Sequence, residues 1–227
     1  MKKENQSILA FLGQAAQSKS LIFDFKNQYP QEDNQSLTPL FIDFEKIIRN
    51  PETRTTIIDI IKSEVEFIKD AEIIIGMGSV GASIATLIAE LFGKKLINGP
   101  EIPKKATVGK CIVFKDQLIN GKKTIGFIDD LQNAGYDCLG IFVIFNENLV
   151  ITEERFQGKT GVKEAGNTIK LKKPCIIKNI LTPQKIYNAM NSSEDPFVKM
   201  LGEQYKQIHD FKETEEFAVA AKSASSE

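Results

Sequence analysis

Two segments of this chain carry residue types that can bind phosphate. The first is Gly-Met-Gly-Ser-Val-Gly (76–81), which follows the apolar run AEIIIG (71–76). Glycine lets a backbone approach a phosphate closely, and a following helix presents free amide groups at the positive end of its dipole. We therefore predict a phosphate or pyrophosphate site here. A dinucleotide site and a plain tight turn stay open. A dinucleotide site needs an acid about 20 residues further on, where Glu101 is the only candidate.

The second segment is CIVFKDQLINGKKT (111–124), in which an apolar run leads into Lys115 and Asp116. We expect a strand that ends in this charged pair, a short turn, and a helix that starts at Thr124. A carboxylate at such a strand end can accept hydrogen bonds from sugar hydroxyls. The amides of 119–124 and the Thr124 hydroxyl can hold a phosphate monoester, and Lys122 and Lys123 add positive charge. The alternative is a solvated turn with a chance acid.

The elements around these segments alternate between strands and helices, which predicts βαβ units, a parallel sheet and an α/β fold. The expected strands are 21–25, 40–48, 71–76, 94–97, 111–116, 138–146 and 174–180. The expected helices are 4–18, one starting at Asn50-Pro51 and running to about Ile68, 82–93, 124–135, 182–190 and 196–212. Residues 147–173 change character, and we expect a peripheral hairpin insertion there.

Composition excludes several classes of function. The chain has 227 residues and a formal net charge of −1, which argues against nucleic-acid binding by a basic field and against a polybasic membrane anchor. No apolar stretch approaches the ~18 residues of a membrane span, and the N-terminal sequence lacks the apolar core of a signal peptide. We therefore expect a cytoplasmic protein.

Cysteine and histidine offer little chemistry. Cys111, Cys138 and Cys175 lie far apart in the sequence and each borders an apolar run, so we expect buried hydrophobic residues rather than disulfides or a zinc site. The single histidine, His209, lies in a segment typical of the solvated face of a helix. We do not expect it to be catalytic.

Four segments together resemble a known family. They are FIDFEKIIRNPETRTTIIDIIKSEV (41–65), the unit around the glycine-rich segment (73–97), the unit around Asp116 (111–145) and CIIKNILTPQKI (175–186). Their order and spacing resemble the type I phosphoribosyltransferases, and most closely an orotate phosphoribosyltransferase. The resemblance implies an open parallel sheet flanked by helices, with a small N-terminal hood. It places this domain at 1–195, with the hood at about 1–45, the insertion at about 147–173, and a C-terminal helix and tail at 196–227.

The resemblance also implies an activity and its residues. Family members transfer a phosphoribosyl group from phosphoribosyl pyrophosphate to a nitrogen base, which here would be a pyrimidine, with magnesium and usually as homodimers. Asp116 would bind the ribose hydroxyls, Lys105 would contact the leaving pyrophosphate, and Lys26 would contact the base. The implied pyrophosphate ligands are Met77, Gly78, Ser79, Val80 and Gly81. The implied phosphoribose ligands are Lys115, Asp116, Asn120, Gly121, Lys122, Lys123 and Thr124.

The sequence departs from the family pattern at three places. Lys115 stands where the family has the first of two acids, and a cation can neither accept hydrogen bonds from ribose nor share a magnesium shell. The phosphate turn has Ile119 and Lys122 where the family has threonine and glycine. The segment 98–110 is roughly a dozen residues shorter than the family's catalytic loop and has no histidine or arginine. The alternative prediction is therefore a catalytically impaired protein that binds a nucleotide or phosphoribose as a regulator or partner subunit.

Overall fold

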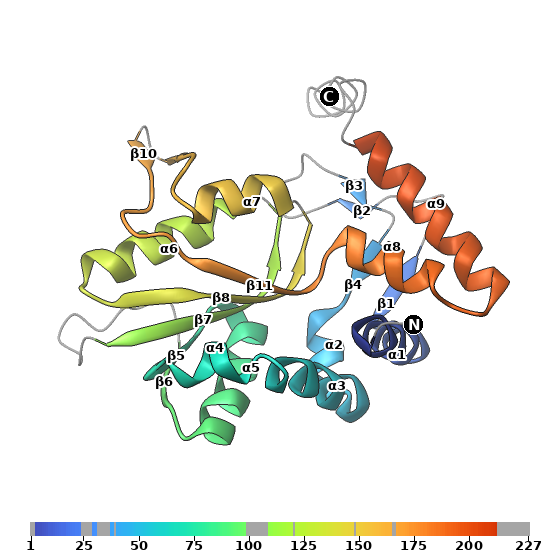
Figure 1. Cartoon of the computed structure of the whole chain (residues 1–227), viewed down its shortest axis with the longest axis horizontal. Helices are drawn as coiled ribbons and strands as arrows, with labels where there is room; N and C mark the ends of the chain where they lie inside the picture. Colours follow the sequence, from blue (N-terminus) through green and yellow to red (C-terminus); the bar gives the residue numbers. More distant parts are fainter. Residues whose placement is uncertain are drawn as a thin grey trace. The chain divides into compact units, whose positions relative to one another are not determined.

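The computed structural model describes residues 3–23, 29–30, 37–38, 40–98, 109–119, 121–147, 149–164 and 167–212 (Figure 1). The chain divides into two compact units, and one of the two boundaries between them, at residues 56 and 57, falls inside a helix. The first unit combines residues 1–56 with 183–227, and the second comprises residues 57–182. The two candidate phosphate-binding segments, 76–81 and 111–124, both lie in the second unit.

The second unit is built on a five-stranded sheet in which all neighbouring strands are parallel. Its strands are β5 (Ile73–Gly76), β6 (Lys95–Asn98), β7 (Lys110–Leu118), β8 (Asp137–Asn146) and β11 (Ile176–Leu181). Their spatial order is β11-β8-β7-β5-β6. Every side chain of β5 is buried, as expected for a strand covered on both faces. The prediction of an α/β fold with an open parallel sheet is confirmed.

Helices cover both faces of this sheet (Figure 1). The helices of the second unit are α4 (Val65–Lys69), α5 (Gly78–Phe92), α6 (Lys122–Asn133) and α7 (Leu149–Phe156). On one face, Cys111, Val113 and Val143 join a core with residues of α6 and α7. On the other face, the Phe114 and Phe142 rings stack with centroids 5.1 Å apart, and Phe67 of α4 meets Phe142 edge-on at 5.5 Å.

The first unit is mostly helical. It contains α1 (Lys3–Gln17), β1 (Leu21–Phe23), β2 (Tyr29–Pro30), β3 (Leu37–Thr38), β4 (Leu40–Ile42), α2 (Phe44–Arg49), α8 (Pro183–Asn191) and α9 (Pro196–Lys212). Helix α3 (Pro51–Lys62) begins in this unit. Strands β1 and β4 pair antiparallel, as do β2 and β3. Phe23 of β1 meets Tyr205 of α9 edge-on, with ring centroids 5.9 Å apart.

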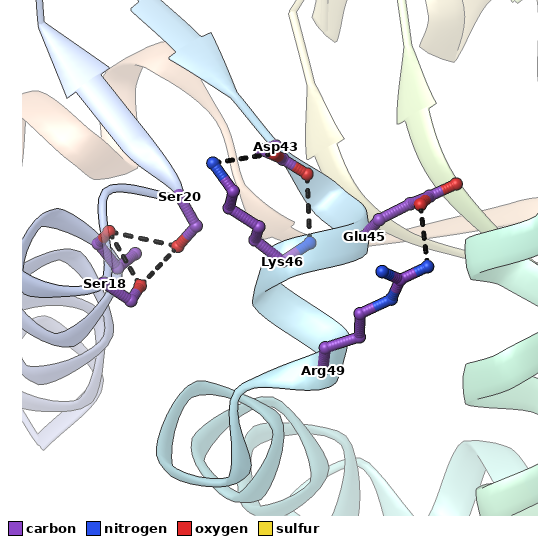
Figure 2. A network of polar contacts seen from close by, with 7 residues as sticks. Ser18, Ser20, Asp43, Glu45, Lys46 and Arg49 are labelled. Carbon is purple, nitrogen blue, oxygen red and sulfur yellow. Dashed lines mark hydrogen bonds and ion pairs between the residues drawn. The ribbon is translucent and has the colours of Figure 1, made fainter.

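The expected strand 40–48 is wrong beyond Ile42, because Asp43 starts a helix. Its side chain accepts a hydrogen bond from the Lys46 amide at 3.0 Å, which satisfies one of the free N–H groups of the first turn (Figure 2). The Asp43 amide in turn donates to the Ser20 carbonyl at 2.7 Å. An Arg49–Glu45 ion pair of 3.3 Å follows at helical spacing (Figure 2).

Other expected boundaries also shift. The predicted single helix from Pro51 to Ile68 is interrupted after Lys62 and resumes as α4. The predicted hairpin is present as β9 (Val162–Glu164) and β10 (Asn167–Ile169). The segment 147–173 is nevertheless not peripheral, since it also forms α7 and places Phe156 and Val162 in the core. All three cysteines are buried and free, as predicted. In the described parts of the chain, no helix is long and apolar enough to cross a bilayer.

Candidate functional site

The strand order identifies one edge of the sheet as the place for a ligand. From β5 the chain moves outward to β6 and then returns to the opposite side of β5 for β7, β8 and β11. The direction of winding therefore reverses between β5 and β7. In open α/β sheets, ligands bind outside the carboxyl ends of the strands at such a reversal. The two segments singled out from the sequence follow these two strands.

The glycine-rich segment after β5 forms the first turn of α5. The helix begins at Gly78, four residues earlier than predicted, and Met77 is its N-cap with extended backbone angles. Gly78 has a φ of 77°, which favours glycine, and Gly78 and Ser79 are exposed. The free amides of a first helical turn and the positive end of the dipole favour an anion at this position.

This turn is packed closely onto β7. The Met77 amide donates to the Phe114 carbonyl at 2.9 Å. Gly81 faces the same carbonyl so closely that a side chain at this position would also lie 3.2 Å from the Lys115 Cα. The glycine at 81 therefore brings the start of α5 against the backbone just before the charged pair, and the pyrophosphate segment and Lys115 lie next to each other.

Lys115 and Asp116 form an ion pair with each other. Lys115 Nζ lies 3.2 Å from Asp116 Oδ1, and the same oxygen accepts a hydrogen bond from the Gln117 amide at 2.8 Å. The side chains are 20% and 28% exposed. The expectation that the strand ends at Asp116 is wrong, because β7 continues in register with β8 to Leu118. The pair therefore lies within the last part of the strand, which fixes its backbone.

The phosphate turn after β7 begins α6. Gly121 is the N-cap with a φ of 70°, and its carbonyl accepts a hydrogen bond from the Ile125 amide at 2.8 Å. The helix starts at Lys122 rather than Thr124. Lys122 and Lys123 are exposed, whereas Thr124 is buried.

Helix α7 covers this turn and was missed by the sequence reasoning. A methyl group on Gly121 would lie 3.1 Å from the Phe156 ring and 3.6 Å from the Thr152 methyl. Thr152 is fully buried and paired with the buried side chain of Asn146 at the end of β8, with Asn146 Nδ2 2.8 Å from Thr152 Oγ1. The sequence signal for such a partner is Asn146 itself, a polar residue that directly follows the apolar run CLGIFVIF.

The structure thus brings Met77–Gly81, Lys115, Asp116 and 121–124 to one edge of the sheet. Lys26, Lys105 and Asn120 lie outside the described residues. The Lys115–Asp116 pair does not suit magnesium, because the Lys115 ammonium holds Asp116 Oδ1 at 3.2 Å and would repel a second cation. No group of three or more His, Cys, Asp or Glu side chains in the described residues can hold a metal ion.

Known proteins resemble this chain in structure but not detectably in sequence. No protein-family model matches the sequence, and no curated protein matches it. The structure is similar to Leishmania donovani UMP synthase, with a TM-score of 0.66 and 13% identity over 92% of this chain. This chain spans only 43% of that protein.

Proteins that this chain covers over 90% or more of their own length are similar as well. Orotate phosphoribosyltransferase from Aeropyrum pernix has a TM-score of 0.61 and 12% identity, covering 78% of this chain and 97% of its own. Adenine phosphoribosyltransferase from Leishmania tarentolae has a TM-score of 0.52 and 17% identity, covering 78% of this chain and 90% of its own. The chain therefore has the fold of the type I phosphoribosyltransferases.

Proposed function

We propose that this chain binds a phosphorylated ribose, as phosphoribosyl pyrophosphate or a nucleotide, at the edge between β5 and β7. The amides of the first turn of α5 would bind the diphosphate, and the first turn of α6 would bind the 5-phosphate. The strand reversal between β5 and β7 supports this placement, as do the two helix starts that flank it.

We further propose that the bound ligand is not turned over efficiently, so that the protein acts as a regulator or as the partner of an active subunit. The observation that carries this step is the Lys115–Asp116 ion pair of 3.2 Å. In the family that the chain resembles, two adjacent carboxylates accept hydrogen bonds from the ribose hydroxyls. Here Lys115 stands in place of the first acid, and its ammonium group holds the Oδ1 atom of Asp116, the second. A preorganised contact to developing charge is typically worth ~10²–10³ in rate, so its loss leaves slow chemistry.

The second candidate is transfer of the phosphoribosyl group to a pyrimidine base. It is supported by the likeness to orotate phosphoribosyltransferase and to UMP synthase over most of this chain. In that reaction the base nitrogen forms a bond to the anomeric carbon as the bond to pyrophosphate breaks. Asp116 Oδ2 would bind a ribose hydroxyl, Lys105 would contact the leaving pyrophosphate and Lys26 the base.

One sample distinguishes the two candidates. Phosphoribosyl pyrophosphate is titrated calorimetrically into the protein with and without magnesium, and orotate consumption is then measured on the same sample. Binding without orotate consumption supports the regulator or partner subunit. Binding with consumption supports the transferase, and no binding contradicts both. The proposal includes a homodimer, which sedimentation of the same sample tests.

A further inference from the structure

We propose that Lys115 takes the place of a divalent metal ion, so that this site binds a phosphorylated ribose through the ammonium group and without magnesium. This inference rests on the proposed function, and it adds which protein group neutralises the negative charge of the bound phosphates. Its starting point is the mismatch between the Lys115–Asp116 ion pair and a magnesium site.

The backbone places Lys115 at the reversal of the sheet. It lies one residue beyond Phe114, which is in register with Gly76 at the end of β5, and it is itself in register with Val143 of β8. The close approach of Gly81 sets the first turn of α5 against the Lys115 Cα. Lys115 therefore lies at the end of β7, at the same end of the sheet as the first turn of α5 and the first turn of α6.

The ammonium group keeps donors for such an anion. A lysine ammonium has three N–H groups. Within the described residues, Asp116 is the one partner of Lys115 Nζ, so two donors are left for a ligand or water. The side chain is only 20% exposed, which limits its freedom and strengthens its attraction to phosphate relative to a fully solvated lysine.

Asp116 positions the ammonium group rather than a metal. Its Oδ1 accepts both from Lys115 and from the Gln117 amide at 2.8 Å, so the carboxylate is held by its own strand. A magnesium ion at this carboxylate would meet the Lys115 charge at close range, and the like charges would repel. We therefore expect that replacing Lys115 with an uncharged or acidic residue makes ligand binding depend on magnesium.

The test is a calorimetric titration of phosphoribosyl pyrophosphate in chelator and in magnesium. The wild-type dissociation constants in the two buffers should agree within about threefold. Lys115→Met should weaken binding in chelator by about 10-fold or more, because a charged hydrogen bond is lost. Lys115→Arg should keep chelator-resistant binding, since it keeps the charge. Lys115→Asp should bind only when magnesium is present.

Lys110→Met is the matched control. Lys110 is an exposed residue at the opposite end of the same strand, and its substitution should leave both dissociation constants unchanged. Thermal melts establish whether each variant is folded. If Lys115→Met does not fold, the charged variants Lys115→Arg and Lys115→Asp remain for the comparison. Wild-type binding that disappears in chelator, or Lys115→Met binding equal to wild type, overturns the inference and leaves the proposed ligand standing. Absence of wild-type binding in both buffers overturns the proposed function together with the inference.

Discussion

Gly81 of α5 lies directly against the carbonyl group of Phe114 in β7, and a Cβ atom at position 81 would be 2.4 Å from that oxygen. The contacted group is backbone in the middle of a parallel sheet, which cannot move aside without loss of ladder hydrogen bonds. The smallest residue is therefore required for α5 to begin next to the charged pair.

Gly81→Ala should accordingly lower the free energy of unfolding by about 1–3 kcal/mol, as overpacking of a closed contact does. It should also weaken phosphoribosyl pyrophosphate binding, because α5 must move away from β7. The matched control is Gly13→Ala in α1, where a methyl group meets no described atom within 4 Å. That change should stabilise the protein by about 0.5–1 kcal/mol. Urea unfolding measures the free energy of unfolding of both variants. Equal changes for Gly81→Ala and Gly13→Ala would contradict the close packing of Gly81 on Phe114.

Gly121→Ala should destabilise the phosphate turn through two separate effects. The φ of 70° disfavours any L-residue by about 1–2 kcal/mol, and the methyl group would press on Phe156 at 3.1 Å. Gly93→Ala isolates the first effect, since Gly93 has a φ of 62° and open space around it. The difference between the two losses in chemical denaturation measures the contact with α7. A loss for Gly93→Ala as large as that for Gly121→Ala would show that α7 does not press on the turn.

Thr152→Val should cost about 1–3 kcal/mol of stability, because the buried Asn146 amide loses the hydroxyl that it contacts at 2.8 Å. The volume of the side chain hardly changes, so the cost reports the hydrogen bond rather than a cavity. Asn146→Leu combined with Thr152→Val should recover part of the loss, and the resulting double-mutant cycle gives the coupling. Additive effects of the two substitutions would mean that the pair does not hold α7 to the end of β8.

The buried thiols should make stability fall at alkaline pH. Contact with the Cys111 thiol and burial raise the pKa of Cys138, and contact with the Cys138 thiol and burial raise the pKa of Cys175. Both groups therefore stay protonated in the folded protein. In the unfolded chain they ionise above about pH 8.5, which favours unfolding by up to about 1.4 kcal/mol per pH unit for each thiol.

Urea unfolding between about pH 7 and about pH 9.5 checks this, because the window begins below the ordinary thiol pKa and ends below that of tyrosine. Stability should be constant in the lower part of the range and decline in the upper part. Cys138→Ala combined with Cys175→Ala should flatten the decline. A decline that the double variant keeps unchanged would assign it to other groups.

The sheet was predictable because its strands carry their own signal. IIIG (73–76), CIVF (111–114) and CLGIFVIF (138–145) are continuous apolar runs, and such runs are typical of strands buried on both faces. The glycine-rich segment and the Asp116 segment were found because each directly follows one of these runs. What they contact across the sheet, including the approach of Gly81 to Phe114, depends on strand order and could not be read from one segment.

The errors arose where two patterns fit the same letters. Phe44, Ile47 and Ile48 fit the buried face of a helix, yet the segment 40–48 also alternates partly like a strand, and the cap at Asp43 decides between them. Helix α7 has only eight residues, which is too short for a clear helical pattern. Its Phe156 packs against Gly121, which is distant in the sequence, so this contact could not be read from the segment itself.

The ion pair of Lys115 with Asp116 was not predicted for a simple geometric reason. Successive side chains of a strand point to opposite faces, so neighbours in sequence are not expected to meet. Here the long lysine side chain reaches the carboxylate of the next residue at the partly exposed end of β7. The sequence indicates that Lys115 replaces one acid of the family's acidic pair. The structure adds that the charges of Lys115 and Asp116 neutralise each other.

Amide NMR shift mapping with phosphoribosyl pyrophosphate both detects binding and locates the ligand on the protein. The largest shifts should fall on the amides of 78–81 and 121–124, with smaller ones at Lys115 and Asp116. The amides of α1 in the first unit should stay unchanged. Absence of shifts at a large excess of ligand, or shifts concentrated away from the ends of β5 and β7, would show that the phosphorylated ribose does not bind at this site.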